Sequence, residues 1–170
     1  RNVNPLAKKA PQRITAGGSE IYAWSVYDVN QTPPGLYQVD ESSLSLMWND
    51  PFYTDNEYTL SSGYLKDGKI YGAAVDTFWG MIFAYTQVVW DFQTGEVLSQ
   101  EELDLNTMPY FGRMAYNPDD DCIYGTGLYA PYDGGATQLL LKAQADDWSQ
   151  VEGLAELSNE SALGAMCYNG

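Results

Sequence analysis

The segment Asp67-Gly68-Lys69-Ile70-Tyr71-Gly72 joins a turn signal to a short apolar and aromatic run, and similar segments occur on both sides of it. The matching pairs are Ile21-Tyr22, after Gly17-Gly18, and Ile123-Tyr124, after a run of aspartates. The three Ile-Tyr pairs are spaced by about fifty residues. Self-similarity at such a period indicates a repeated supersecondary unit.

Each unit contains four predicted strands, with Gly, Asn and Asp turn residues between the first and second and between the third and fourth. The predicted first strands are 13–16, 62–65 and 114–117, and the second strands are 20–27, 69–76 and 122–129. The predicted third strands are 35–40, 86–92 and 137–142, and the fourth strands are 44–48, 97–101 and 148–153. An aromatic content of 14% also favours strands over helices. We therefore expect an all-β fold.

Four short antiparallel strands in a unit of about fifty residues match the blade of a β-propeller. We expect a flexible N-terminal segment, 1–11, and then blades at approximately 12–60, 61–112 and 113–162, with the first strand of a fourth at 163–170. Closed propellers have about four to eight blades. The sequence therefore predicts a partial ring, whose remaining blades are partners on the same or another chain.

Two hairpins carry a resemblance to a known family. The Asp67–Gly72 hairpin and the third-strand hairpin Val88-Val89-Trp90-Asp91-Phe92-Gln93-Thr94-Gly95-Glu96 are similar to those of bacterial extracytoplasmic β-propellers of the quinoprotein-like and surface-lipoprotein kinds. The resemblance covers residues 12–170 and implies the propeller fold. The chain has no WD or kelch signature and no cofactor or metal motif, so we expect neither a cofactor nor a metal.

The chain is strongly acidic. It has 23 Asp and Glu against 8 Lys and Arg, a formal net charge of −15, and half of the basic residues lie in the first thirteen positions. An acidic body repels phosphate backbones, which disfavours nucleic-acid binding. No run approaches the ~20 apolar residues of a membrane-spanning helix. We expect no nucleic-acid partner and no membrane-spanning segment.

Histidine is absent from the sequence, which removes the commonest general base and zinc ligand. Cys122 and Cys167 lie in apolar contexts without CxxC spacing, so we predict that both are small buried residues. The chain begins at Arg1 rather than Met and contains no signal peptide. We expect a secreted, periplasmic or cell-surface protein whose export signal has been removed.

Aromatic side chains recur in the predicted connections at one end of every unit. In a four-stranded antiparallel blade, the second-to-third and fourth-to-first connections share one face. The predicted ligand-binding residues on that face are Phe52, Tyr53, Phe78, Trp79, Tyr110, Phe111, Tyr132 and Asp133. Such rings, beside acids at positions 50, 55 and 76, can stack on sugars or anchor a protein interface. The same rings could instead fill the wedges between adjacent blades.

The run Asp119-Asp120-Asp121 carries the ligand type that calcium prefers. It lies at the opposite, short-hairpin end and lacks the spacing of a calcium loop, so we interpret it as a solvated turn. Trp24, Trp90 and Trp148 lie in or beside predicted strands, and we predict that they belong to the core. No carboxylate pair can be singled out as catalytic, and we predict no catalytic residue.

These observations lead to the hypothesis of a secreted or cell-surface β-propeller that binds a polysaccharide or protein ligand through its aromatic loops. One alternative is a polysaccharide lyase or hydrolase of propeller fold whose catalytic groups lie partly outside this chain. Another is a structural scaffold, which burial of the loop aromatics would favour.

Overall fold

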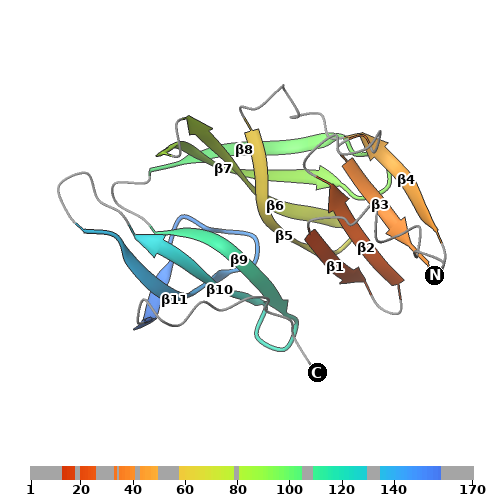
Figure 1. The fold of residues 1–170 in the computed structure, drawn as a ribbon. Coiled ribbons are helices and arrows are strands. Elements are labelled where there is room, and N and C mark those ends of the chain that lie inside the picture. Colours follow the sequence, from red (N-terminus) through yellow and green to blue (C-terminus); the bar gives the residue numbers. More distant parts are fainter. Residues whose placement is uncertain are drawn as a thin grey trace, which may run out of the picture.

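The computed structural model describes residues 13–17, 20–25, 33, 35–40, 43–49, 58–78, 81–104, 109–129 and 135–157, with only the backbone for 13–17, 20–21, 24–25, 58–61, 75–78 and 81–84. Within these ranges every regular element is a strand (Figure 1). The strands are β1 (Arg13–Gly17), β2 (Glu20–Ser25), β3 (Gly35–Val39), β4 (Leu44–Asn49), β5 (Tyr58–Lys66), β6 (Lys69–Phe78), β7 (Met81–Asp91), β8 (Val97–Leu103), β9 (Tyr110–Asn117), β10 (Cys122–Tyr129), β11 (Thr137–Gln144) and β12 (Glu152–Glu156). The all-β prediction is confirmed. No helix in the described part of the chain could span a lipid bilayer.

The strands form three antiparallel sheets of four strands each, and each sheet is a simple meander. Their orders are β1-β2-β3-β4, β5-β6-β7-β8 and β9-β10-β11-β12. We refer to them as the first, second and third sheets. Strands adjacent in sequence are adjacent in space, so each sheet forms from local pairings.

The hairpin at Asp67-Gly68 is as the sequence predicts. Lys66 pairs with Lys69, which leaves a two-residue loop, and both loop residues have positive φ, 51° for Asp67 and 70° for Gly68. Asp and Gly tolerate this conformation, and a turn of this twist matches the twist of the flanking strands. The β7–β8 hairpin of this sheet is closed by Asp91, whose Oδ1 accepts hydrogen bonds from the backbone N–H groups of Gln93 and Thr94.

Strand lengths differ from the prediction in several places: β5 and β9, for example, each begin four residues earlier than predicted, at Tyr58 and Tyr110. β7 begins at Met81 rather than at position 86, and Met81 pairs with Phe78, so the predicted long connection is a short hairpin. The fourth strand of the third sheet begins at Glu152 rather than at Trp148. Trp148 instead lies in the irregular segment before β12 and is fully buried there. Burial against the second sheet therefore overrides the strand pattern at this tryptophan.

The predicted alignment of the first strands is wrong by one residue in the third sheet. The predicted first strands 62–65 and 114–117 put Tyr64 and Tyr116 at the same position, but Tyr64 pairs with Tyr71 while Tyr116 pairs with Ile123. The β9–β10 turn holds four residues where the β5–β6 turn holds two. The longer turn moves Tyr116 to the opposite face of its sheet.

The second sheet is packed on both faces. One face contributes Ile70, Ala74, Val88, Trp90 and Phe92 to a cluster with Tyr22, Leu36 and Trp48 of the first sheet. The other face contributes Tyr64, Tyr71, Ala73, Tyr85, Val89 and Leu103 to a cluster with the third sheet, which supplies Phe111, Met114, Ile123, Leu141, Ala143, Ala145 and Trp148. Side chains alternate between the two faces along a strand. Ile70 of β6 therefore packs against the first sheet, and its neighbour Tyr71 packs against the third. The predicted core positions Trp90, Trp148 and Cys122 are confirmed as buried. Trp24 has no described side chain, and Cys167 lies outside the described residues.

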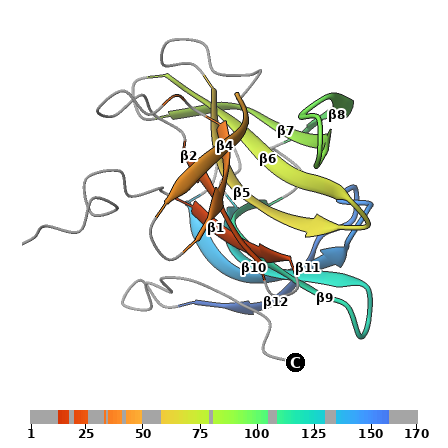
Figure 2. The same cartoon turned by 90° about the vertical axis from the view of Figure 1, so that its right-hand side faces the viewer.

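The first strands of the sheets lie near one another. β1 contacts β5, and β5 contacts β9. In Figure 2 β1 and β5 lie towards the middle of the view, whereas β8 lies at its upper right and β12 near its bottom. The sheets are therefore closest along their first strands.

Trp48 fixes the first sheet on the second. Its indole Nε1 donates a hydrogen bond of 3.0 Å to the carbonyl oxygen of Phe92. Its ring lies against Gly95, where a Cβ would come within 2.5 Å of the indole Cδ2. Gly95 also has a φ of 73°, which favours glycine. The β7–β8 turn therefore needs glycine for two reasons.

We expect Gly95→Ala to lower the free energy of unfolding by about 2 kcal/mol, because the added methyl group displaces the Trp48 ring and the φ is unfavourable. Gly68→Ala is the matched control, since Gly68 has a φ of 70° but no atom lies within 4 Å of the position that an added methyl group would take. The control should lose only about 1 kcal/mol. Urea unfolding followed by tryptophan fluorescence measures both, and equal losses would contradict the contact with Trp48.

Candidate functional site

Most of the predicted ligand-binding residues lie outside the described structure. This holds for Phe52, Tyr53, Trp79, Tyr132 and Asp133. Phe78 is the last residue of β6, and its side chain is not described. Tyr110 and Phe111, at the start of β9, are the two whose side chains the structure places.

Tyr110 and Phe111 occupy different environments. Phe111 is fully buried, and its ring centroid lies 6.0 Å from that of Trp148. Tyr110 is partly exposed and lies over Tyr85, with ring centroids 5.7 Å apart. The hydroxyl oxygen of Tyr85 accepts a 3.0 Å hydrogen bond from the backbone N–H of Phe111. Phe111 therefore supports the start of β9 from the core, and Tyr110 presents part of its ring at the surface.

Burial raises the pKa of both tyrosines at this end of the sheets, Tyr85 and Tyr110. The hydroxyl groups therefore stay neutral at physiological pH and keep a proton to donate. A neutral phenol on a fixed ring provides a stacking surface and a hydrogen-bond donor. This combination suits binding of a polar ligand with an apolar face.

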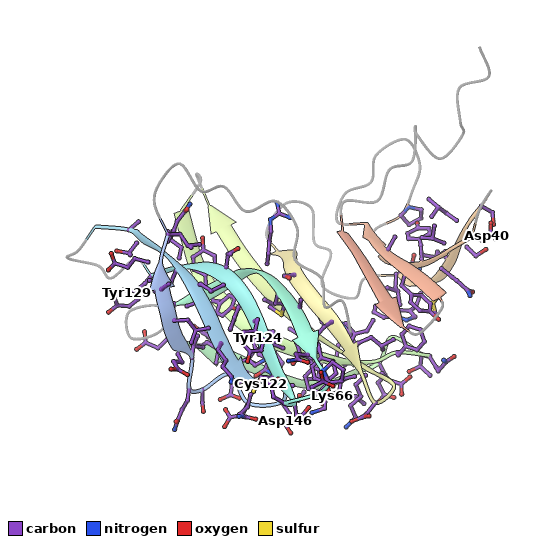
Figure 3. The ribbon with its side chains drawn as sticks, turned by 90° about the horizontal axis from the view of Figure 1, so that it is seen from below. Asp40, Lys66, Cys122, Tyr124, Tyr129 and Asp146 are labelled. Atoms are coloured by element: carbon purple, nitrogen blue, oxygen red, sulfur yellow. The ribbon has the colours of Figure 1, made fainter. Side chains whose placement is uncertain are left out.

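At the other end of the sheets, Asp121 connects the second and third sheets. One carboxylate oxygen, Oδ1, lies 2.6 Å from the Lys66 ammonium and accepts a 2.9 Å hydrogen bond from the Tyr116 hydroxyl. The Lys66 ammonium also lies 5.7 Å from the Tyr116 ring centroid. Figure 3 shows Lys66 and Cys122 at this end and Tyr129 at the far end of β10. Lys66 therefore bridges β5 to the β9–β10 turn.

Asp120 makes a parallel set of contacts on the opposite face of the same hairpin. Its Oδ2 accepts a 2.5 Å hydrogen bond from the Tyr124 hydroxyl and lies 3.4 Å from the Lys142 ammonium. Lys142 also lies 5.2 Å from the Tyr124 ring centroid. A shallow hollow of about 340 Å³ opens beside it, lined by Lys142, Ala143, Gln144, Gln150, Val151 and Glu152.

The pairing keeps both aspartates charged. Hydrogen bonds from Lys66 and then Tyr116 lower the pKa of Asp121, and hydrogen bonds from Tyr124 and then Lys142 lower that of Asp120. The Tyr124 hydrogen bond and the Asp120 contact raise the pKa of Lys142. These groups stay ionised near neutral pH, so they suit fixed ion pairing better than proton transfer.

An aromatic stack lies beneath these ion pairs. Tyr64 stacks on Tyr71 and on Tyr116, with centroid distances of 5.3 Å and 5.6 Å. Its hydroxyl donates to the carbonyl oxygen of Ala145 and accepts a 3.3 Å hydrogen bond from the Trp148 indole. Tyr64 thereby holds the segment after β11 against the second sheet.

The turn at 119–121 is exposed, as predicted. Its aspartates also form ion pairs and hydrogen bonds with other strands, which the sequence did not indicate. Sequence reasoning missed its partners Lys66, Tyr116, Tyr124 and Lys142. One signal was present: only four basic residues follow position 13, so each is a candidate partner for a dense aspartate run. No group of three or more potential metal ligands occurs among the described residues.

We expect Asp121→Asn to lower the melting temperature at pH 7 by no more than about 4 °C, because exposed ion pairs contribute little. The pKa of Asp121 is lower in the folded state than its ordinary value of 3.8. Its stabilising effect is therefore present above pH 3.8 and is lost as the pH falls through the folded pKa. Thermal melts of both proteins should converge in acid. Glu101→Gln on β8 is the control, and a difference independent of pH would contradict this role.

Comparison with known proteins identifies no relative: no protein-family model matches the chain, and no curated protein matches it. The function is therefore inferred from the chain itself.

Proposed function

We propose that the chain forms successive blades of a β-propeller, of the bacterial extracytoplasmic kind that the two hairpins resemble. We propose further that it works as a binding module outside the cytoplasm, secreted, periplasmic or on the cell surface. Its ligand is a polysaccharide or a protein, bound at the aromatic end of the sheets that includes Tyr110. The described sheets supply a rigid base for that end.

The packing of the second sheet supports the propeller. In a propeller the blades pack face to face around a central axis, so a blade with a neighbour on each side is covered on both faces. The first strands of the blades line the axis and therefore lie closest together. A backbone contact also recurs: Phe92 donates its N–H to the carbonyl oxygen of Gly68, and Ala145 donates to that of Asp121. In both sheets the residue after the third strand is thus bonded to the first hairpin turn. This recurrence is what a repeated blade predicts.

The observation that supports binding most directly is the placement of Tyr110. Tyr110 is partly exposed and lies against the buried Tyr85, which also accepts a hydrogen bond from the backbone N–H of Phe111. An aromatic side chain fixed in this way loses little conformational entropy when it contacts a ligand. Loop aromatics such as Trp79 and Tyr132, which the sequence places at the same end, would extend the surface.

We expect Tyr110→Ala and Trp79→Ala each to weaken ligand binding at least about tenfold, since anchoring aromatics commonly contribute more than 1.4 kcal/mol. The ligand is first found by screening the wild-type chain on glycan and bacterial surface-protein arrays. Gln93→Ala, in the exposed β7–β8 turn at the other end of the second sheet, is the control and should bind as the wild type does. Circular dichroism confirms that the variants fold. Unchanged affinity in both aromatic variants would argue against this surface.

A further inference from the structure

The first strands of the three sheets carry basic residues and no acidic ones. β1, β5 and β9 contain Arg13, Lys66 and Arg113, and none of their residues is Asp or Glu. In the third sheet β10 and β11 also lack acidic residues, and the two acids of its strands, Glu152 and Glu156, both lie on β12. The third sheet therefore has an arginine on its first strand and its acids on its last.

This separation decides what a ligand at β9 experiences, because charge is screened in salt solution. Crossing from the first to the fourth strand of a sheet covers three spacings of ~4.8 Å, or about 14 Å. The Debye length at physiological ionic strength is about 8 Å. An anion beside Arg113 is therefore attracted by that arginine more strongly than it is repelled by the acids of β12, although the whole chain has a net charge of −15.

The charge of Arg113 is available to a ligand. Lys66 and Lys142 are each paired with an aspartate. Arg113 is exposed, and in the part of the chain that the structure describes it forms no hydrogen bond or ion pair. Thr126 lies directly opposite on β10, so its half-buried side chain projects to the same face beside the arginine. A guanidinium and a hydroxyl group therefore lie together on the inner part of this sheet.

The position of Arg113 recurs in the other sheets. Arg113 pairs with the second residue after the Ile-Tyr pair of its sheet, and the residues paired at that position in the first and second sheets are Arg13 and Ser62. In β5 and β9 the extra residue of an irregular pairing comes directly before this position. Ser62 Oγ accepts a 2.9 Å hydrogen bond from the backbone N–H of Met114, so this level of β5 lies against β9 beside Arg113.

Arg113 is also close to Tyr110 on the same strand. Arg113 pairs with Thr126 and Tyr110 pairs with Leu128, and these partners are two residues apart on β10. Two residues of a strand cover about 7 Å. A sugar ring with a carboxylate substituent is of this size. The guanidinium group matches a carboxylate with two parallel hydrogen bonds, and the neutral tyrosine ring can stack on the sugar.

We infer that the ligand of the Tyr110 surface is a polysaccharide containing uronic acids, and that Arg113 binds its carboxylate groups; this rests on the proposed function. A uronic acid carries the carboxylate on the same rigid ring that stacks on the tyrosine. An acidic peptide carries its carboxylates on separate flexible side chains, whose ordering costs free energy. The pair of Tyr110 and Arg113 therefore suits the sugar better.

Titration calorimetry of the whole chain with polygalacturonate, alginate and the methyl-esterified form of each tests this inference. We expect at least one uronate polymer to bind at least about tenfold more tightly than its uncharged ester, because a hydrogen bond between charged groups contributes more than a neutral one. Arg113→Gln should remove this preference, and Arg113→Lys should keep part of it. Lys69→Gln is the control, since Lys69 is likewise exposed but lies at the other end of the second sheet. Circular dichroism confirms that the variants fold.

Failure of both uronate polymers to bind, or equal binding of the polymers and their esters, would overturn the inference. So would equal losses in Arg113→Gln and Lys69→Gln, which would show a general effect of net charge, or tighter binding of a polyglutamate peptide than of either polymer. The proposed function is judged separately, by Tyr110→Ala. A neutral glycan or a protein whose binding is lost in Tyr110→Ala and kept in Arg113→Gln would reject the uronate ligand alone.

Discussion

Trp148→Ala is expected to lower the free energy of unfolding by about 3 to 5 kcal/mol. The indole is fully buried, lies against Phe111 and Tyr64, and donates its Nε1–H to the Tyr64 hydroxyl. Its removal leaves a cavity between the second and third sheets. Trp148→Phe should lose less, since the ring contacts are partly kept.

The effect should be confined to one interface. Trp48 and Phe92 belong to the other cluster, between the first and second sheets. Hydrogen exchange of Trp148→Ala should therefore show faster exchange in β9–β12 than in β1–β8. Uniform acceleration in all three sheets would contradict separate interfaces. Urea unfolding measures the total loss.

Gly127→Ala is expected to destabilise the protein by about 3 kcal/mol. Gly127 adjoins the irregular pairing of β9 with β10, and a Cβ there would overlap the carbonyl oxygen of Tyr110 and come within 2.6 Å of Leu141 Cδ1. The obstacle includes backbone, so β9 itself would have to move. Because Tyr110 sits at this point, ligand binding should weaken together with stability.

Gly112→Ala provides the matched control at the same irregularity. A Cβ at Gly112 would lie 3.6 Å from the carbonyl oxygen of Thr126, which is ordinary contact. This substitution should be neutral or should stabilise the fold by up to about 1 kcal/mol, through a less flexible unfolded chain. Urea midpoints of the two variants measure the contrast. Similar midpoints would show that β9 does not approach Gly127 as closely as the structure indicates.

Local signals in the sequence were sufficient for the number and order of the strands in each sheet and for the hairpin at Asp67-Gly68. Asp67-Gly68 predicts a two-residue turn because the two residues tolerate positive φ without help from the rest of the chain, and the structure agrees. The strand at Cys122–Tyr129 was predicted with the observed ends. Both features depend on neighbours in sequence.

Features that depend on contacts between sheets were missed. Trp148 has a strand-like sequence context, but its contact with Tyr64, 84 residues away, places it in an irregular segment. The position of Tyr116 depended on the length of a turn whose pairing the spacing did not reveal. The ion pairs of Asp121 and Asp120 join the β9–β10 turn to Lys66 of the second sheet and to Lys142 of the third, so no spacing rule could find them.

The propeller arrangement can be tested most directly by pulsed electron spin resonance between pairs of nitroxide labels, after both native cysteines are replaced. Labels at Asp67 and Asp119 report the separation of the first hairpins of the second and third sheets, and labels at Ser99 and Leu154 report that of their fourth strands; all four positions are exposed. Blades that radiate from an axis predict a clearly longer distance for the Ser99–Leu154 pair than for the Asp67–Asp119 pair. Equal distances would show parallel stacking of the sheets and would contradict the propeller.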